Sequence, residues 1–260
     1  MKWEKFNAIL ESVIKMNEKI YTIPVNEAFD KDGSCALCHL RQKLEKEAVD
    51  YSLGGAMMEP DYRIISNEKG YCNRHFSMML PKKEKLSLAL LLETHLDEIK
   101  KTINSINADI DEIIKDKRSV FKKKNTPTSK TMADKISAIT SSCVICDKLN
   151  STMERYIRVL FYLWEKEEDF KTKFINSKGF CLPHLKALTE GAYKHLSKKK
   201  AAEFLKILYE KEKTELENLR DEVHKFTLMF DYRNAGQKWG SEADAPKRCI
   251  EKLSSYIINE

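Results

Sequence analysis

The sequence predicts an all-α protein made of two tandem helical repeat units, and three observations support this fold class. Gly and Pro are scarce, with 8 and 6 residues among 260, which argues against a turn-rich β fold. Residues that favour helices, above all Lys, Glu, Leu and Ile, are abundant. A Cys/His signature also occurs twice, 108 residues apart (Cys35 to Cys143). We therefore expect two helical halves, each held by a metal site, and then a C-terminal loop and a closing helix.

The first half, residues 1–121, is expected to be helical apart from two segments. Pro disfavours helix in the residue before it, so the Ile23-Pro24-Val25 segment is predicted to be extended. Residues 53–70 hold three glycines and one proline and are predicted to form a structured loop. The apolar periodicity predicts helices at 2–19, from Cys38 to about Val49, from Cys72 to about Pro81, and at 84–120.

The long helix at 84–120 has apolar residues that alternate by four and three positions. This heptad spacing is typical of the seam between packed helices in a coiled coil. The seam consists of Leu92, Leu96, Ile99, Ile103, Ile106, Ile110 and Ile113.

The second half, residues 134–260, follows a linker at 122–133 and is expected to repeat the plan. Its predicted elements are helices at 147–167, from Cys181 onward and at 197–229, then a loop at 231–240 and a closing helix at 243–257. We expect this tail to pack back on the second half.

Each copy of the signature joins a Cys-x2-Cys pair to a Cys-x2-His pair 33 or 34 residues later. Six of the seven cysteines belong to the two copies, and only Cys249 lies outside them. Three cysteines and one histidine leave no open coordination position, which is typical of structural zinc. We therefore expect two Zn²⁺ per chain, each bound within one half: Cys35, Cys38, Cys72 and His75 in the first, and Cys143, Cys146, Cys181 and His184 in the second.

The signature is also compatible with chemistry that does not involve zinc. An iron–sulfur cluster can use three cysteines and one histidine. A redox dithiol is another alternative, but it needs only one Cys-x2-Cys pair. Buried cysteines without metal are a further alternative, but they would not require the matched spacing of the two copies. The Cys35-to-His39 stretch spells a c-type haem attachment sequence. The second copy has Asp147 where His39 stands, so haem does not explain both copies.

Two polar groups are candidates for ligand binding. One lies in the predicted loop before Cys72, where carboxylates beside an arginine could form an acid/base site or simply an ion pair. The other lies in the C-terminal tail. Their members are Glu59, Asp61, Arg63 and Asn67, and Asp231, Arg233, Asn234 and Trp239.

Charge and hydropathy limit the location and the partners that we expect. The net charge of +6 is modest, and the local basic runs do not support nucleic-acid binding. The N-terminus has charged residues where a signal peptide needs an apolar run, and the longest apolar stretch, 88–92, is too short to cross a bilayer. We expect a cytoplasmic protein without membrane contact, where thiols stay reduced.

Seven short stretches are shared with a known family: residues 23–29, 58–63, 70–76, 162–164, 179–184, 231–234 and 239–240. On these residues the chain resembles an uncharacterised bacterial family, a domain of unknown function with paired Cys/His sites. Members of that family are sometimes labelled ABC transporter substrate-binding proteins, and the lack of a signal peptide or lipid-anchor cysteine argues against that label. The resemblance covers nearly the whole chain and implies little chemistry.

The sequence favours a zinc-stabilised binding or adaptor protein for an unknown protein or small-molecule ligand. One alternative is an enzyme whose pocket lies between the repeats and uses Glu59, Asp61 and Arg63. The other alternative is a redox sensor in which thiolates release zinc on oxidation. No nucleophile or open metal position stands out, so the sequence does not favour an enzyme.

Overall fold

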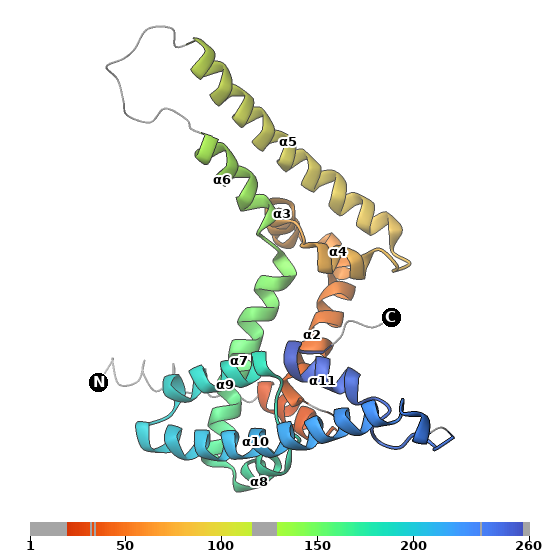
Figure 1. Cartoon of the computed structure of the whole chain (residues 1–260). Helices are drawn as coiled ribbons and strands as arrows, with labels where there is room; N and C mark the ends of the chain where they lie inside the picture. The colour runs from red at the N-terminus through yellow and green to blue at the C-terminus, as the bar shows by residue number, and fades with distance from the viewer. Residues whose placement is uncertain (1–19, 32, 34, 116–128, 235, 257–260) are drawn as a thin grey trace, which may run out of the picture. The chain divides into compact units, whose positions relative to one another are not determined.

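The computed structural model describes residues 20–31, 33, 35–115, 129–234 and 236–256, and these residues are helical with short connections (Figure 1). No strand occurs in this described part, which confirms the all-α prediction. Residues 20–29 are helical. The helices that follow are α2 (Ala36–Leu53), η1 (Gly55–Met58), α3 (Pro60–Lys69), α4 (Asn73–Met79), α5 (Lys85–Lys115), α6 (Ser129–Thr140), α7 (Val144–Lys166), α8 (Glu168–Asn176), α9 (Leu182–His195), α10 (Lys198–Leu228), η2 (Tyr232–Asn234) and α11 (Ala245–Ser254).

Contacts within the chain divide it into two compact units that differ from the predicted tandem halves. Unit 1 combines residues 1–43 with 151–260, and unit 2 consists of residues 44–150. The boundary therefore falls inside α2 and inside α7, and each of these helices contributes to both units. The predicted boundary at 122–133 differs from this division. Residues 129–133 belong to α6, and residues 122–128 lie outside the described part, as does the predicted opening helix at 2–19.

Unit 1 is built around aromatic side chains from α7, α8 and α10. Phe174 packs against Phe204 with ring centroids 4.9 Å apart, and Phe204 lies 5.2 Å from Trp164. Phe29, from the helical residues 20–29, meets Phe170 edge to face at 5.0 Å. Burying such large rings is the main favourable contribution to the stability of this unit.

The Ile23-Pro24-Val25 segment is helical, so the prediction of an extended segment is wrong. Val25 and Ala28 are buried on the same side of this helix. Their packing outweighs the local preference that Pro24 imposes, because tertiary contacts routinely override propensity.

Unit 2 contains α3 to α6, with the adjoining parts of α2 and α7. The predicted loop at 53–70 is wrong, because this segment forms η1 and α3. Pro60 begins α3, where its missing N–H costs nothing. The helix packs on α5, and His95 Nδ1 lies 2.7 Å from the Asn67 carbonyl oxygen. Residues 53–70 thus form helices that pack within unit 2.

Helices α5 and α6 lie side by side in unit 2 (Figure 1). The Lys135 ammonium of α6 donates to Ser105 Oγ at 2.9 Å and to the Asp109 carboxylate at 2.5 Å. Both partners lie on α5, so α6 packs along part of that long helix. We refer to this pair of helices as the α5–α6 arm.

Candidate metal centres

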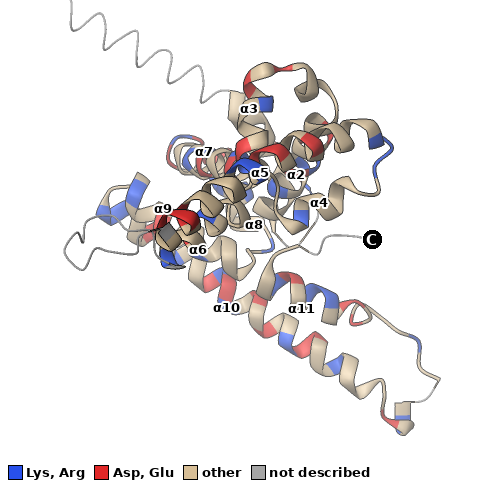
Figure 2. Cartoon of the chain, turned by 90° about the horizontal axis from the view of Figure 1, so that it is seen from above, with Lys and Arg blue, Asp and Glu red and all other residues tan. Residues whose placement is uncertain are grey.

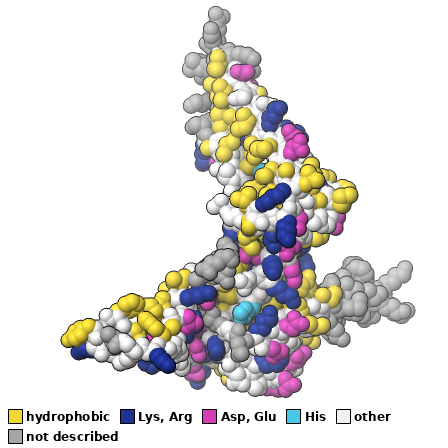
Figure 3. Space-filling model, turned by 90° about the vertical axis from the view of Figure 1, so that its right-hand side faces the viewer, with side chains coloured by type: hydrophobic (Ala, Val, Ile, Leu, Met, Phe, Trp, Pro, Cys, Tyr) yellow, Lys and Arg dark blue, Asp and Glu magenta, His cyan; other side chains and the backbone are white. Residues whose placement is uncertain are grey.

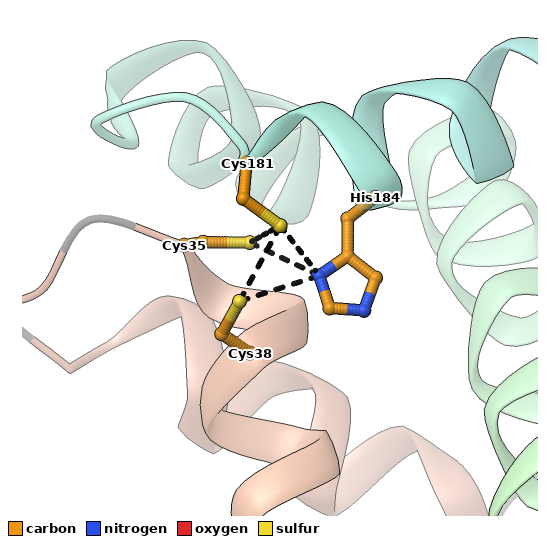
Figure 4. A group of neighbouring side chains, drawn as sticks. All are labelled: Cys35, Cys38, Cys181 and His184. Carbon is orange, nitrogen blue, oxygen red and sulfur yellow. Dashed lines mark hydrogen bonds between the residues drawn. The ribbon is translucent and has the colours of Figure 1, made fainter. Parts of the chain in front are cut away.

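The structure brings together all eight predicted metal ligands in two clusters, but it pairs them across the halves. Site A contains the first Cys-x2-Cys pair and the second Cys-x2-His pair (Figure 4). Site B contains the other two pairs. The prediction that each site forms within one half is therefore wrong. The clusters are Cys35, Cys38, Cys181 and His184 in site A, and Cys72, His75, Cys143 and Cys146 in site B.

The length of α2 explains the crossed pairing in the first half. Cys35 and Cys38 lie at the start of this 18-residue helix, which carries the chain ~27 Å away at 1.5 Å per residue. Helix α3 is too short to bring the chain back over that distance. Instead His75 meets α2 at Glu45, ten residues beyond Cys35 and thus ~15 Å along the helix.

Helix α7 has the same effect in the second half. It runs for 23 residues from the Cys143 and Cys146 pair, or ~35 Å. The nine-residue α8 cannot reverse this displacement before Cys181. Each Cys-x2-His pair therefore meets the Cys-x2-Cys pair of the other half. Site A lies within unit 1, and site B lies within unit 2.

Site A has the spacing of a tetrahedral metal site. The Sγ atom of Cys181 lies 4.0 Å from that of Cys35 and 3.5 Å from that of Cys38. His184 Nδ1 lies 3.1–3.5 Å from the three sulfur atoms. An ion ~2.3 Å from sulfur and ~2.0–2.1 Å from nitrogen needs edges of ~3.8 Å and ~3.6 Å. The four donors therefore fit one such ion at their centre.

Site B has the same spacing. Cys72 Sγ lies 3.7 Å from Cys146 Sγ. His75 Nδ1 lies 3.2 Å from the sulfurs of Cys72 and Cys143, and 3.6 Å from that of Cys146. All six sulfur atoms in the two sites belong to free cysteines. Both clusters therefore present the donors that a soft divalent ion prefers.

Each histidine follows the cysteine that begins its helix. Cys72 and Cys181 are the extended N-cap residues of α4 and α9, so the cysteine and the histidine three positions later share one face of the first turn. Gly70 and Gly179 precede these caps with φ angles of 61° and 83°. Only glycine adopts this backbone readily, and the turn directs each cysteine toward its site.

Glu212 of α10 positions the turn that leads into site A. Its carboxylate accepts the Phe180 N–H at 2.6 Å and pairs with the Lys252 ammonium of α11. Glu212 and Lys252 are buried. A side chain at Gly179 would collide with Glu212, since an added Cβ would lie 2.6 Å from Oε1. At the end of α11, Ser255 Oγ lies 3.3 Å from Cys38 Sγ. The closing helix therefore contacts site A directly.

Replacing Glu212 should destabilise the protein strongly. Glu212→Ala leaves the Lys252 ammonium and the Phe180 N–H buried without their partner, and losing one member of a buried ion pair costs ~3–5 kcal/mol. Urea denaturation followed by circular dichroism measures the change. Glu217→Ala, on an exposed position of the same helix, is the control and should stay within about 0.5 kcal/mol. An equally small effect of Glu212→Ala would contradict this role.

Glu45 of α2 holds the histidine of site B. Its carboxylate lies 3.1 Å from His75 Nε2 and accepts two hydrogen bonds of 2.7 Å from the Arg74 guanidinium. This arrangement leaves Nδ1 of His75 directed at the three sulfurs. A carboxylate on the outer nitrogen fixes the ring and makes it a better metal ligand.

Removing the Glu45 charge should weaken metal binding at site B alone. For Glu45→Gln we expect a ~10–100-fold loss of affinity there, the usual effect of losing such a partner. Competition with a chromophoric chelator measures the affinity, and mapping of alkylated cysteines shows which site has opened. Glu47→Gln, exposed on the same helix, serves as the control. Equal weakening of both sites would exclude this assignment.

Without metal, the histidine of each site has a raised pKa. Burial lowers the pKa of His75, but hydrogen bonds with Cys143 and Glu45 outweigh burial and raise it to about 9. In site A, burial likewise lowers the pKa of His184, but hydrogen bonds with Cys181 and Cys38 outweigh burial and raise it to about 9. Hydrogen bonds from neighbouring thiols hold the pKa of Cys38 well below its ordinary value. A metal ion therefore replaces protons when it binds.

The predicted polar group at 59–67 forms contacts within unit 2 rather than a common pocket. Tyr51 donates to the Glu59 carboxylate at 2.6 Å. Arg63 donates to Thr94 Oγ1 at 3.0 Å, and Thr94 donates to Asn67 at 2.6 Å. Asp61 is exposed in the first turn of α3. These contacts fasten α3 to its neighbours in unit 2.

The predicted polar group in the tail lies in unit 1. Arg233 pairs with Asp231 at 2.5 Å, and Asn234 donates to the Leu228 carbonyl oxygen at 2.7 Å. The Trp239 ring lies 5.1 Å from that of Phe226. Their contacts shape the end of α10 and the turn after it.

The sequence analysis missed the residues that support the sites, namely Glu45, Arg74, Glu212 and Lys252. Glu45, Glu212 and Lys252 have Lys or Glu beside them in the sequence, so no local pattern distinguishes them from solvated residues, whereas Arg74 lies inside the signature beside His75. Glu45 carried a weak signal, because it lies between Leu44 and Ala48 on the side of α2 that becomes buried.

Helices with short connections and two closed Cys/His clusters define a class, an all-helical protein with two candidate metal centres. The chain belongs to a family of unknown function, DUF6062, whose sequence profile matches residues 16–260. This membership confirms the resemblance to an uncharacterised family. Comparison with curated proteins and with solved structures gave no match.

Proposed function

We propose that the protein is a zinc-stabilised helical binding protein. The observation that carries this proposal is the pair of closed four-ligand clusters. Zn²⁺ favours tetrahedral sites of three thiolates and one imidazole, and four protein ligands leave no position for substrate or water. Donor atoms 3.1–4.0 Å apart surround space for a single ion, which favours zinc over an iron–sulfur cluster. The reduced cysteines suit a cytoplasmic protein.

The metal content tests this proposal directly. Native mass spectrometry with elemental analysis should find two zinc ions per chain, one for each cluster. A strong chelator should then abolish much of the helical circular dichroism, because the binding energy of structural zinc contributes to folding. Iron in the purified protein, or full helicity after complete zinc removal, would contradict the proposal.

The binding surface that we propose is the apolar face of the α5–α6 arm. Five seam residues of α5 and Ile136 of α6 are 37–60 % exposed. Figure 3 shows hydrophobic side chains along the arm, in the upper part of the view. The exposed seam residues are Leu92, Leu96, Ile103, Ile110 and Ile113. A contiguous apolar face of this kind marks an interaction site.

The occupant that we propose for this face is the same face of a second copy. Isoleucine at both core positions of a heptad favours assemblies of more than two helices, and two α5–α6 arms would form a four-helix bundle. Sedimentation equilibrium should show a dimer that Ile103→Glu converts to a monomer, while Lys101→Glu, elsewhere on α5, leaves it intact. A wild-type chain that stays monomeric would reject self-pairing.

The alternatives have less support. Glu59 and Arg63 are engaged by neighbouring side chains within unit 2, so an enzyme that uses them would first have to break these contacts. Acidic and basic residues are interspersed along α10 and α11 (Figure 2), which does not favour a nucleic-acid surface. In the described part of the chain, every helix is too short or too polar to cross a membrane.

A further inference from the structure

The two sites share one donor set but differ in their exposure. All four ligands of site A are buried, with at most 7 % of any of them exposed. In site B, His75 and Cys143 are buried, whereas Cys72 and Cys146 are partly exposed. The chain thus contains a matched pair of sites in which only one offers sulfur atoms to solvent.

The two accessible sulfurs of site B lie next to each other. Cys72 Sγ and Cys146 Sγ are 3.7 Å apart, along one edge of the tetrahedron. Cys72 caps α4 and Cys146 lies in the first turn of α7. Exposed thiolates react with oxidants more readily than buried ones, and a thiol neighbour lets the first oxidation product form a disulfide.

Site B also joins the two ends of the α5–α6 arm at its base. Helix α4, which carries Cys72 and His75, directly precedes α5. Helix α7, which begins at Cys143 and Cys146, directly follows α6. The Val144 N–H donates to the Gly70 carbonyl oxygen at 3.2 Å beside the site. A change at site B therefore affects both the segment that leads into α5 and the segment that follows α6.

We propose that site B is an oxidation-sensitive zinc site at which hydrogen peroxide converts Cys72 and Cys146 to a disulfide and releases the metal. This inference rests on zinc binding as proposed above. The buried ligands of site A keep their ion under the same conditions. Loss of the site B ion loosens the base of the arm and reduces pairing through its apolar face.

The reaction balances with peroxide as the two-electron oxidant. One thiolate attacks a peroxide oxygen, the O–O bond breaks, and a sulfenic acid and hydroxide form. The second thiolate attacks that sulfur, the S–S bond forms, and a second hydroxide leaves. Two protons convert both hydroxides to water. Zn²⁺ then keeps only Cys143 and His75 as protein ligands, and it dissociates.

Native mass spectrometry of the full-length zinc protein during titration with dilute hydrogen peroxide tests the inference. We expect one of the two zinc ions to be lost first. As it is lost, a peptide pair linked by a Cys72–Cys146 disulfide should appear in the digest. The cysteines of site A should remain free for alkylation after unfolding. Reduction with dithiothreitol and added Zn²⁺ should restore the second ion.

Two variants sharpen this test. Cys249→Ser removes the partly exposed cysteine outside both sites and should leave the response unchanged. Cys146→His keeps four ligands but removes the disulfide partner, so its zinc should resist peroxide. If this variant does not fold, the order in which the wild-type protein loses its two zinc ions still tests the inference. Loss of both ions together, or oxidation of site A first, overturns the inference. A chain that binds no zinc refutes the proposed function instead.

Discussion

A chain that carries Cys35→Ser and His184→Ala should retain one zinc ion, whereas Cys35→Ser with His75→Ala should retain none. In the first variant both substitutions remove ligands from site A, so site B stays complete. In the second variant each site loses one ligand. If the sites formed within the halves, the two results would be exchanged. The two variants contain the same kinds of substitution, so only the pairing of the ligands distinguishes them.

Native mass spectrometry counts the bound ions, and circular dichroism reports the folding of both variants. The variant that keeps site B should lose stability in unit 1, because apparent zinc-binding energies of ~10–16 kcal/mol are as large as the stability of a domain. Cys249→Ser controls for the loss of a cysteine outside the sites and should keep both ions. One retained ion in the Cys35→Ser, His75→Ala variant would reject the crossed pairing.

The sequence predicts the helices well because their causes are local. Helix α10 spans Lys198–Leu228, close to the predicted range 197–229, because a regular apolar stripe runs along it. The prediction of a loop at 53–70 is wrong for a different reason. The glycines at 54 and 55 mark a single turn, and the contact of α3 with α5 turns the rest into helix.

The eight ligands could be identified from the sequence, but their partners could not. A spacing of three positions places a cysteine and a histidine on one face of a helix, and this geometry is local. Which pair completes the tetrahedron depends on how far α2 and α7 carry the chain. The predicted helix from Cys38 to Val49 indicates that its two ends lie apart, but the contacts that complete each site are tertiary and have no local signal.

The crossed pairing also predicts that the halves cannot be separated into two zinc proteins. We expect fragments 1–121 and 122–260, expressed singly, to lack a stable one-zinc monomer, because each fragment contains half of each site. Mixed with Zn²⁺, they should form a one-to-one complex with two ions and the helicity of the intact chain. Size-exclusion chromatography with light scattering and native mass spectrometry measure the assembly.

A matched mixture tests whether the metal sites drive this complementation. Fragment 1–121 with Cys35→Ser should still join its partner, but the complex should hold one ion, at site B. A wild-type fragment 1–121 that folds alone as a monomer with one zinc ion would show that the four ligands of one half can meet. The expected result would instead show that each half completes the metal sites of the other, so that zinc binding couples the folding of residues from both ends of the chain.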